Sequence, residues 1–332
     1  MSEFADIPVI DVSAIHGDDA VAKQNLAQEF AKAYGETGFG YIKNHGISTQ
    51  LQERVFAASA RFHNADHATK MAVELNRLHR GFIPINTSTD VNSKLADVKK
   101  PNQSESFMVM REDAADAPPV LAGDYLAGPN QWPDQLPDPT EFRADVMAYH
   151  DGLAELANSL LEIVELSVGA DPGDLTQHFD LPTTWLRLLY YPPTDPMAGS
   201  GSDGDLFGSA PHTDFGCLTI LAQDDIGGLQ VQTPAGNWVN APRIEGTFVV
   251  NVGDMLHRWS NGLLRSTPHR VINSSGKSRY SCPFFYDPNV ATMVAPLAAT
   301  VSPQRPAQFE PLNFGAFLRS ELEAGYQKHK QN

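Results

Sequence analysis

The sequence feature that most constrains the fold is a succession of short β-rich runs that begins after about residue 183. Seven such runs follow one another closely, separated by turns: WLRLLYY, CLTILAQ, GLQVQT, NWVNA, TFVVNVG, HRVIN and RYSCPFFY. Short strands at this density are typical of all-β sandwiches and barrels. We therefore expect this part of the chain to form a β-core, with helices packed outside it.

The first part of the chain shows helical periodicity between shorter strand-like runs. Apolar residues recur at helical spacing in DDAVAKQNLAQEFAKAYGETGFG, and a long amphipathic helix is predicted from Thr140 to near Gly169. Strands are expected across IPVIDVSAI and FGYIKNHGIS, and a second helix across 49–75. The segment 112–140 is rich in Pro, Asp and Gly, so we expect an irregular surface connection there.

The chain is acidic, with 24 Lys and Arg against 40 Asp and Glu in 332 residues and a net charge of -16. This length fits one large folded unit with accessory helices. The charge leaves no basic field for nucleic acid or an anionic membrane surface, so we expect neither as a partner. Any anionic ligand must be bound by a local cationic pocket.

Cysteine usage and the N-terminus indicate a cytoplasmic protein. Cys217 and Cys282 are the only two cysteines, which is too few for a disulfide framework. The segment MSEFADIPVIDVSAI begins acidic and lacks the basic and apolar regions of a secretory signal. No run approaches the ~20 apolar residues of a membrane-spanning helix. The oligomeric state is not indicated.

The run PHTDFGCLTI places His212 and Asp214 one residue apart at the mouth of an apolar, β-branched stretch. Side chains at i and i+2 of a strand point to the same face, so both are expected to project together into the core. An unpaired buried carboxylate is costly to desolvate, and a divalent cation removes that cost by binding both groups.

A third candidate ligand is His269 in STPHRVIN, again at the edge of a β-branched run. Two histidines and one carboxylate form the facial triad that suits non-haem Fe(II) and leaves positions open for other ligands. Mixed nitrogen and oxygen ligation fits Fe(II) better than Mg²⁺ or a thiolate zinc site. The sequence therefore predicts an iron site.

The run SRYSCPFFY contains a candidate anion site. Arg279 and Ser281 are at i and i+2, so they share a strand face and can bind a carboxylate through a guanidinium fork and a hydroxyl group. This is the local cationic pocket that an anionic co-substrate requires in an acidic protein.

Together these motifs resemble the isopenicillin N synthase-like family of Fe(II)- and 2-oxoglutarate-dependent oxygenases. The resemblance is carried by His212-x-Asp214, His269 and Arg279-x-Ser281. Further pieces extend it over nearly the whole chain: IPVIDVS, GFGYIKNHGI, RGFIP, YYPP, GLQVQTPAGNWV and NVGDMLHRWSNGLLRSTPHRV. The combination is far more specific than any single piece.

The resemblance implies an α+β fold in which a double-stranded β-helix, or jelly roll, is framed by N-terminal, central and C-terminal helices. The expected divisions are an N-terminal region at 1–140, a framing helix region at 141–182, the jelly-roll core at 183–295 and a C-terminal helix at 296–332.

The resemblance also implies an oxidoreductase that uses Fe(II), 2-oxoglutarate and O2. The expected reaction oxidises a C–H bond of a small molecule, by hydroxylation in the simplest case, with release of succinate and CO2. Carried over by position, the iron ligands are His212, Asp214 and His269, and the residues that bind 2-oxoglutarate are Arg279, Ser281 and Tyr191. Many plant members have an asparagine where this chain has Leu189.

Five side chains are candidates for the wall of the substrate pocket. Strand alternation from Arg279 and Ser281 directs Pro283 and Phe285 toward the cavity. Arg187 shares a face with Tyr191 and is either a partner for a substrate anion or part of an ion pair at the barrel edge. Phe82 and Phe207 are further lining candidates.

Two alternatives remain open at this stage. One is an Fe(II) oxidase of the isopenicillin N synthase type, in which the Arg279 pocket binds a substrate carboxylate and no 2-oxoglutarate is used. The other is a jelly roll that binds a ligand without catalysis. Of the remaining histidines, His63 and His67 are spaced as on a helix and are expected to lie on a solvated face.

Overall fold

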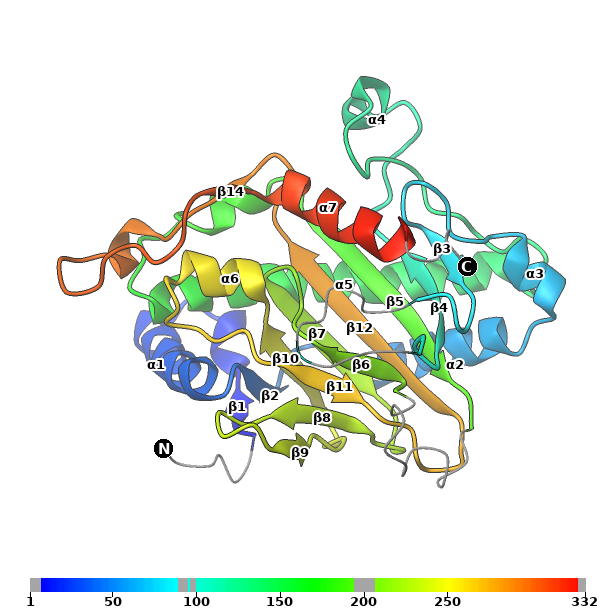
Figure 1. The fold of residues 1–332 in the computed structure, drawn as a ribbon, viewed down its shortest axis with the longest axis horizontal. Helices are drawn as coiled ribbons and strands as arrows, with labels where there is room; N and C mark the ends of the chain where they lie inside the picture. The colour runs from blue at the N-terminus through cyan, green and yellow to red at the C-terminus, as the bar shows by residue number, and fades with distance from the viewer. Residues whose placement is uncertain (1–6, 89–94, 96–99, 194–206, 328–332) are drawn as a thin grey trace.

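Two facing β-sheets form the centre of the computed structural model, which describes residues 7–88, 95, 100–193 and 207–327 (Figure 1). The larger sheet has eight strands in the order β1-β2-β10-β7-β12-β5-β4-β3, and the smaller has four in the order β6-β11-β8-β9. The larger sheet comprises β1 (Val9–Asp11), β2 (Phe39–Lys43), β3 (Gly81–Ile83), β4 (Glu105–Val109), β5 (Thr183–Tyr191), β7 (Leu218–Gln223), β10 (Thr247–Val252) and β12 (Arg279–Asp287).

The smaller sheet lies in front of the larger one in Figure 1 and comprises β6 (Ser209–His212), β8 (Leu229–Gln232), β9 (Trp238–Asn240) and β11 (His269–Val271). A two-stranded ribbon of β13 (Met293–Val294) and β14 (Leu312–Asn313) precedes the last helix. The β-rich runs of the sequence therefore form strands in two layers, as expected for a sandwich.

Seven helices lie in the described part of the chain: α1 (Ala20–Glu36), α2 (Thr49–His63), α3 (His67–Met71), α4 (Pro118–Ala122), α5 (Pro139–Ser167), α6 (Asp254–Trp259) and α7 (Phe314–Gln327). Short 3-10 turns occupy Ser13–His16, Thr176–Phe179 and Ala298–Thr300. The long helix α5 contacts α1 and α2 as well as β7 and β12. None of these helices combines the length and apolar character needed to cross a bilayer.

The larger sheet has two different faces because alternate residues of a strand point in opposite directions. One row of cross-strand neighbours, fully buried, consists of Val109, Leu186, Phe284, Ile220 and Val250. We call the face that carries this row the helix face, because its residues belong to the large core shared with α1, α2 and α5. The opposite face, which carries Ser281, Leu189 and Tyr191 and faces the smaller sheet, is called the cavity face.

Several expectations about secondary structure need correction. The helix predicted across 49–75 is two helices, because Asp66 caps a new start by accepting a hydrogen bond from the Thr69 backbone at 2.8 Å. The strand expected across 7–15 is limited to Val9–Asp11. The larger sheet also extends beyond the region 183–295, since four of its strands come from the first 140 residues.

Candidate metal and co-substrate site

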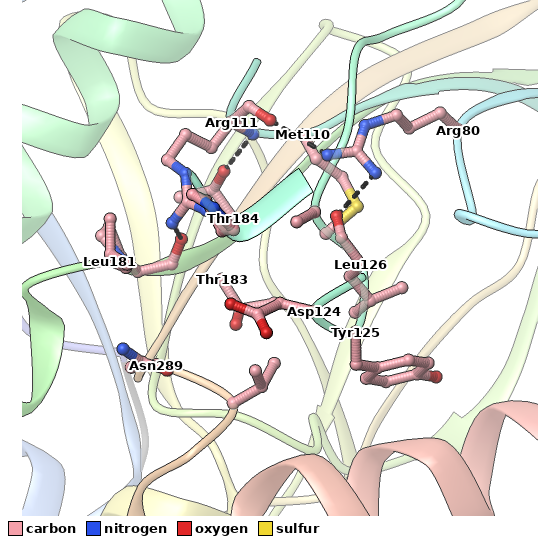
Figure 2. A pocket seen from close by; sticks show the side chains of 14 residues that line it. Arg80, Met110, Arg111, Asp124, Tyr125, Leu126, Leu181, Thr183, Thr184 and Asn289 are labelled. Carbon is pink, nitrogen blue, oxygen red and sulfur yellow. Dashed lines mark hydrogen bonds between the residues drawn. The ribbon is translucent and has the colours of Figure 1, made fainter. Parts of the chain in front are cut away.

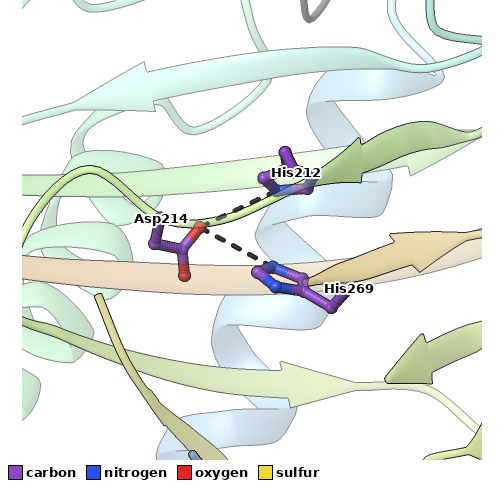
Figure 3. Close-up of side chains that lie close together, drawn as sticks. All are labelled: His212, Asp214 and His269. Carbon is purple, nitrogen blue, oxygen red and sulfur yellow. Dashed lines mark ion pairs between the residues drawn. The ribbon is translucent and has the colours of Figure 1, made fainter. Parts of the chain in front are cut away.

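The structure brings His212, Asp214 and His269 together at one end of the smaller sheet (Figure 3). His212 ends β6 and His269 begins β11, and the two are direct cross-strand partners. The Nε2 atoms of His212 and His269 lie 3.7 and 3.6 Å from Oδ1 of Asp214. One potential ligand atom from each residue thus falls in a group whose members are all within 4.8 Å of one another.

The backbone orients both imidazole rings for coordination. Nδ1 of His212 lies 2.6 Å from the Ala210 carbonyl oxygen, and Nδ1 of His269 lies 3.3 Å from that of Thr267. A carbonyl oxygen only accepts, so each Nδ1–H donates to it, and Nε2 of each ring lies on the side of Asp214. Two imidazole nitrogens and one carboxylate oxygen, oriented in this way, fit a divalent iron ion.

Asp214 lies just beyond the end of β6, not in the strand itself. Its position is determined by the start of α6, whose successive backbone N–H groups donate hydrogen bonds to carbonyl oxygens of the turn 214–217. The N–H groups of Gly253, Asp254 and Met255 donate to the carbonyl oxygens of Cys217, Asp214 and Gly216 at 2.8 to 2.9 Å. The expectation that His212 and Asp214 share a strand face was wrong in detail, although the two side chains do meet.

Close packing holds the same turn from the opposite side. A Cβ atom at Gly216 would overlap the Asp287 carboxylate, so only glycine fits. Oδ1 of Asp287 accepts a hydrogen bond from the Cys217 backbone at 2.8 Å, and burial raises the pKa of Asp287 to about 7. The turn that carries Asp214 is therefore clamped between α6 and the end of β12.

The Asp214 carboxylate is buried, with 7% of its surface exposed. Its Oδ2 atom accepts hydrogen bonds from Thr219 Oγ1 at 2.5 Å and from Asn251 Nδ2 at 2.7 Å. Burial acts to raise the pKa of Asp214, but His269 and His212, together with these two hydrogen bonds, outweigh it and lower the pKa. The carboxylate is therefore ionised and available as a ligand at neutral pH.

Arg279 and Ser281 lie side by side on the cavity face of β12, as strand alternation predicts. Arg279 is fully buried, and its Nη1 group donates to Ser281 Oγ at 3.3 Å. Its cross-strand partner is Tyr191, whose ring centre lies 4.6 Å from the guanidinium carbon. Gln223, which the sequence reasoning missed, accepts from Nη2 at 3.2 Å and donates to the Ala241 carbonyl at 2.8 Å. The guanidinium group is therefore held in one orientation.

The remaining candidates for the pocket wall fall into two groups. Pro283 and Phe285 continue the cavity face of β12, and Phe285 lies between Trp185 and Thr219 on the neighbouring strands. Arg187, on the same face of β5 as Tyr191, is half-buried and donates to Ser106 Oγ at 3.1 Å. These three side chains lie on the same face of the sheet as Arg279.

Phe82 and Phe207 do not line the cavity. Phe82 pairs with Phe107 on the helix face, and its ring packs 5.7 Å from that of Phe62 in α2. The Phe207 ring lies 5.8 Å from the guanidinium carbon of Arg270, which follows His269 and so points away from the interior. Both predictions were wrong because the sequence around these residues does not indicate which face of a strand other elements will pack against.

His63 was expected on a solvated helix face, and the structure buries it instead. Its Nδ1 lies 2.8 Å from Glu105 Oε1, and its Nε2 lies 2.9 Å from the Leu188 carbonyl oxygen. Lys70 donates to the same Glu105 oxygen at 2.8 Å. The partners are 42 and 125 residues away from His63, so sequence spacing carried no signal. His67 is exposed, as expected.

A separate pocket lies between the connection that follows α4 and the start of β5 (Figure 2). Its two cationic side chains, Arg80 and Arg111, are already bound by the protein. Arg80 donates to Asn130 Oδ1 at 3.1 Å, and Arg111 pairs with Asp113 at 2.9 Å. None of the three residues of the His–Asp–His group lines this pocket, so we assign the chemistry to the cavity face.

Two family models match the chain, and together they span most of it. The model described as the 2OG-Fe(II) oxygenase superfamily matches residues 182–288. The model described as the N-terminal region of non-haem dioxygenases in morphine synthesis matches residues 7–135. The first match includes His212, Asp214, His269 and Arg279.

Similar proteins are found among curated sequences and solved structures. The 2-oxoglutarate-Fe(II) type oxidoreductase hxnY of Emericella nidulans is 36% identical over 289 residues, covering 85% of this chain and 79% of the relative. Homoarginine-6-hydroxylase 2-ODD-C23 of Glycine max is 32% identical over 307 residues, covering 89% of each. The crystal structure of a full-length Neurospora crassa protein in complex with alpha-KG and thymine matches with a TM-score of 0.84 at 29% identity, covering 96% of this chain and 97% of that one.

Proposed function

This chain belongs to the 2OG-Fe(II) oxygenase superfamily and is a non-haem Fe(II)- and 2-oxoglutarate-dependent dioxygenase with a jelly-roll core. We propose that it hydroxylates a small molecule that carries a polar or anionic group. The proposal is supported chiefly by one observation: a His–Asp–His group at the end of the smaller sheet and a buried arginine on the face of the larger sheet that faces it occur together.

In this proposal, His212, Asp214 and His269 hold Fe(II) through two Nε2 atoms and one carboxylate oxygen. The backbone carbonyl groups that accept from each Nδ1 would keep Nε2 of both rings directed at the metal. This set of three ligands would leave room on the metal for 2-oxoglutarate and dioxygen.

Arg279 and Ser281 bind the distal carboxylate of 2-oxoglutarate. Gln223 and the Tyr191 ring hold the guanidinium group of Arg279 in place. The side chain therefore loses little conformational entropy when the anion binds. With 2-oxoglutarate and dioxygen, bound iron supplies the oxidant that breaks a substrate C–H bond, while 2-oxoglutarate becomes succinate and CO2. The chain's own task is to orient both molecules and to exclude water.

The substrate is proposed to lie against Phe285 and Pro283 with a polar group at Arg187. A half-buried guanidinium group on the cavity face favours a carboxylate, a phosphate or a carbonyl oxygen as its partner. Relatives act on or bind molecules of this kind, homoarginine for the soybean enzyme and thymine for the Neurospora protein. An apolar wall with one cation selects a small, polar-ended substrate.

The test is oxygen consumption and succinate formation with Fe(II), with and without 2-oxoglutarate, over a panel of amino acids, small peptides, pyrimidines and aromatic metabolites. We expect both oxygen consumption and succinate formation to depend on 2-oxoglutarate and Asp214→Ala to reduce them to background. Asp225→Ala, at a side chain that is 82% exposed, is the matched control and should retain full activity.

The alternatives give distinct outcomes. Oxygen uptake that is indifferent to 2-oxoglutarate would support the isopenicillin N synthase type of oxidase. Binding without oxygen uptake would support a ligand-binding jelly roll. For the substrate, Arg187→Leu should raise the KM for an anionic substrate strongly, while the Kd for 2-oxoglutarate stays unchanged. An unchanged KM would refute the role of Arg187 alone.

A further inference from the structure

We propose that Thr219 and Asn251 are positioning residues that restrict Asp214 to a single metal-binding oxygen and so keep a coordination position open. The inference rests on the metal role proposed above for Asp214. It concerns two side chains that belong to neither the ligand triad nor the Arg279 pocket.

The two residues that donate to Asp214 are neighbours on adjacent strands of the larger sheet. Thr219 on β7 and Asn251 on β10 are direct cross-strand partners on the cavity face. Their residues are 5% and 3% exposed, so water does not compete for their polar groups. Each lies among apolar neighbours in a mainly apolar strand, LTILAQ or TFVVNV, where an unsatisfied buried polar group is costly.

Both donors act on the same carboxylate oxygen. The Thr219 hydroxyl and the Asn251 amide lie 2.5 and 2.7 Å from Oδ2 of Asp214, whereas both histidine Nε2 atoms approach Oδ1. The division of roles is complete: Oδ2 is bound by the protein, and Oδ1 faces the metal position. Two hydrogen bonds to a buried anion also resist rotation of the carboxylate about its Cβ–Cγ bond.

The consequence concerns the number of open positions on the metal. A carboxylate that binds through one oxygen fills one position, so two histidines and Asp214 leave three. Bidentate binding through Oδ2 would fill a fourth position and compete with 2-oxoglutarate or dioxygen. Because Thr219 and Asn251 occupy Oδ2, they favour the one-oxygen mode without adding charge to the site.

The test removes each donor while keeping the shape of its side chain: Thr219→Val and Asn251→Leu. Fe(II) is titrated anaerobically into the metal-free protein, and 2-oxoglutarate binding is followed by the visible charge-transfer absorption of the ternary complex. X-ray absorption of the Fe(II) protein reports the coordination of Asp214. We expect weaker Fe(II) binding by roughly 10- to 100-fold, the range for loss of outer-shell partners of metal ligands, with a lower yield of the 2-oxoglutarate complex.

Two controls separate positioning from a general loss of structure. Thr219→Ser keeps the hydroxyl group and should restore Fe(II) affinity to within about threefold of the parent, because the hydrogen bond to Oδ2 is retained. Thr247 lies on the same strand as Asn251, and its hydroxyl donates to the Ile244 carbonyl. Thr247→Val removes that hydroxyl and should leave Fe(II) affinity unchanged. Each Kd is measured at a temperature where chemical denaturation shows the variant to be folded.

The outcomes are distinguishable from failure of the proposed metal site. If Asp214→Ala binds Fe(II) as tightly as the parent, the metal site itself is wrong. If Asp214→Ala loses Fe(II) but Thr219→Val and Asn251→Leu bind it normally with unchanged coordination, the positioning role is overturned and the metal site stands. Equal impairment of Thr219→Ser and Thr219→Val would also overturn it.

Discussion

The two faces of the larger sheet are made by alternate residues of the same strands, yet one face is apolar in its central row and the other contains polar residues there. On the helix face, the row that includes Leu186, Phe284 and Ile220 is apolar and fully buried. The adjacent row on the cavity face includes Phe285, Thr219 and Asn251, two of which are polar. A shift of one residue along each strand separates a packed core from a reactive site.

Buried charges show the same contrast. On the helix face, Glu105 is bound by His63 and Lys70, so its charge is compensated within the protein. Opposite the cavity face, Asp214 is bound by Thr219 and Asn251 through one oxygen, and its other oxygen is directed at the two histidines. In this protein the two buried carboxylates therefore differ in one respect: Asp214 keeps one oxygen directed at two potential metal ligands, and Glu105 is bound by a histidine and a lysine.

The largest expected effect is a loss of stability from a substitution that disrupts packing on the helix face alone. Phe62→Ala removes a fully buried ring that packs 4.6 Å from Phe107 and 6.1 Å from Phe142. The free energy of unfolding should fall by about 3–5 kcal/mol, measured by urea denaturation. The Kd for 2-oxoglutarate of the folded protein should stay within about twofold. A tenfold change in that Kd would show that the two faces are not independent.

The next largest effect is a loss of 2-oxoglutarate affinity from a substitution on the cavity face alone. Arg279→Lys keeps the charge but loses the planar fork, so 2-oxoglutarate binding should weaken by about 1.5–3 kcal/mol, or roughly 10- to 150-fold in Kd. Isothermal titration of the Fe(II) protein under nitrogen measures it. Arg187→Lys, on the same face of β5, is the matched control and should leave this Kd unchanged. Equal losses in both variants would contradict the assignment of the distal carboxylate to Arg279.

A smaller effect tests the compensated charge of Glu105. Burial acts to raise the pKa of Glu105, but His63 and Lys70 outweigh it and lower the pKa below the ordinary 4.5. A lowered pKa in the folded state means that the ionised form stabilises the fold above about pH 4.5 and that this stabilisation is lost as the pH falls through the folded pKa.

Glu105→Gln should therefore lower the free energy of unfolding by about 1–3 kcal/mol at neutral pH. The difference from the parent should shrink as the pH falls below about 4.5. Denaturation at several pH values measures it, with the exposed Glu29→Gln as the control. A difference that grows in acid would reverse the sign and contradict the ionised state of Glu105.

The smallest effect concerns α7, which contacts the turn that carries Asp214. The rings of Phe215 and Phe317 meet edge to face at 6.1 Å. Phe317→Leu keeps apolar bulk but loses the ring pair, so the free energy of unfolding should fall by about 0.5–1.5 kcal/mol. A loss above about 3 kcal/mol, typical of a buried core truncation, would show instead that the Phe317 ring stabilises the fold mainly through contacts other than Phe215.

Short-range rules predicted the parts of the site that lie in local motifs. Arg279 and Ser281 share a face because they are two residues apart in one strand, and His212, Asp214 and His269 meet as proposed. The same rules missed Thr219, Asn251 and Gln223. A polar residue within an apolar strand was the available signal, but its meaning depends on which strand lies beside it.

The failures have one physical cause. Phe82, Phe207 and His63 were assigned to the wrong environment because burial depends on which surface another element covers. α2 covers the face that carries Phe82 and Glu105, and this contact joins residues far apart in the chain. Local periodicity contains no information about that contact.

The sequence by itself determined the strand periodicity, the residue types that suit iron and a carboxylate, and the acidic charge that requires a local cationic pocket. Only the tertiary structure decided which face of the larger sheet meets the helices and which meets the smaller sheet, which oxygen of Asp214 points at the histidines, and which donors hold the other oxygen. The reason is that periodicity orders side chains within one strand, whereas register and packing between distant strands place them opposite one another.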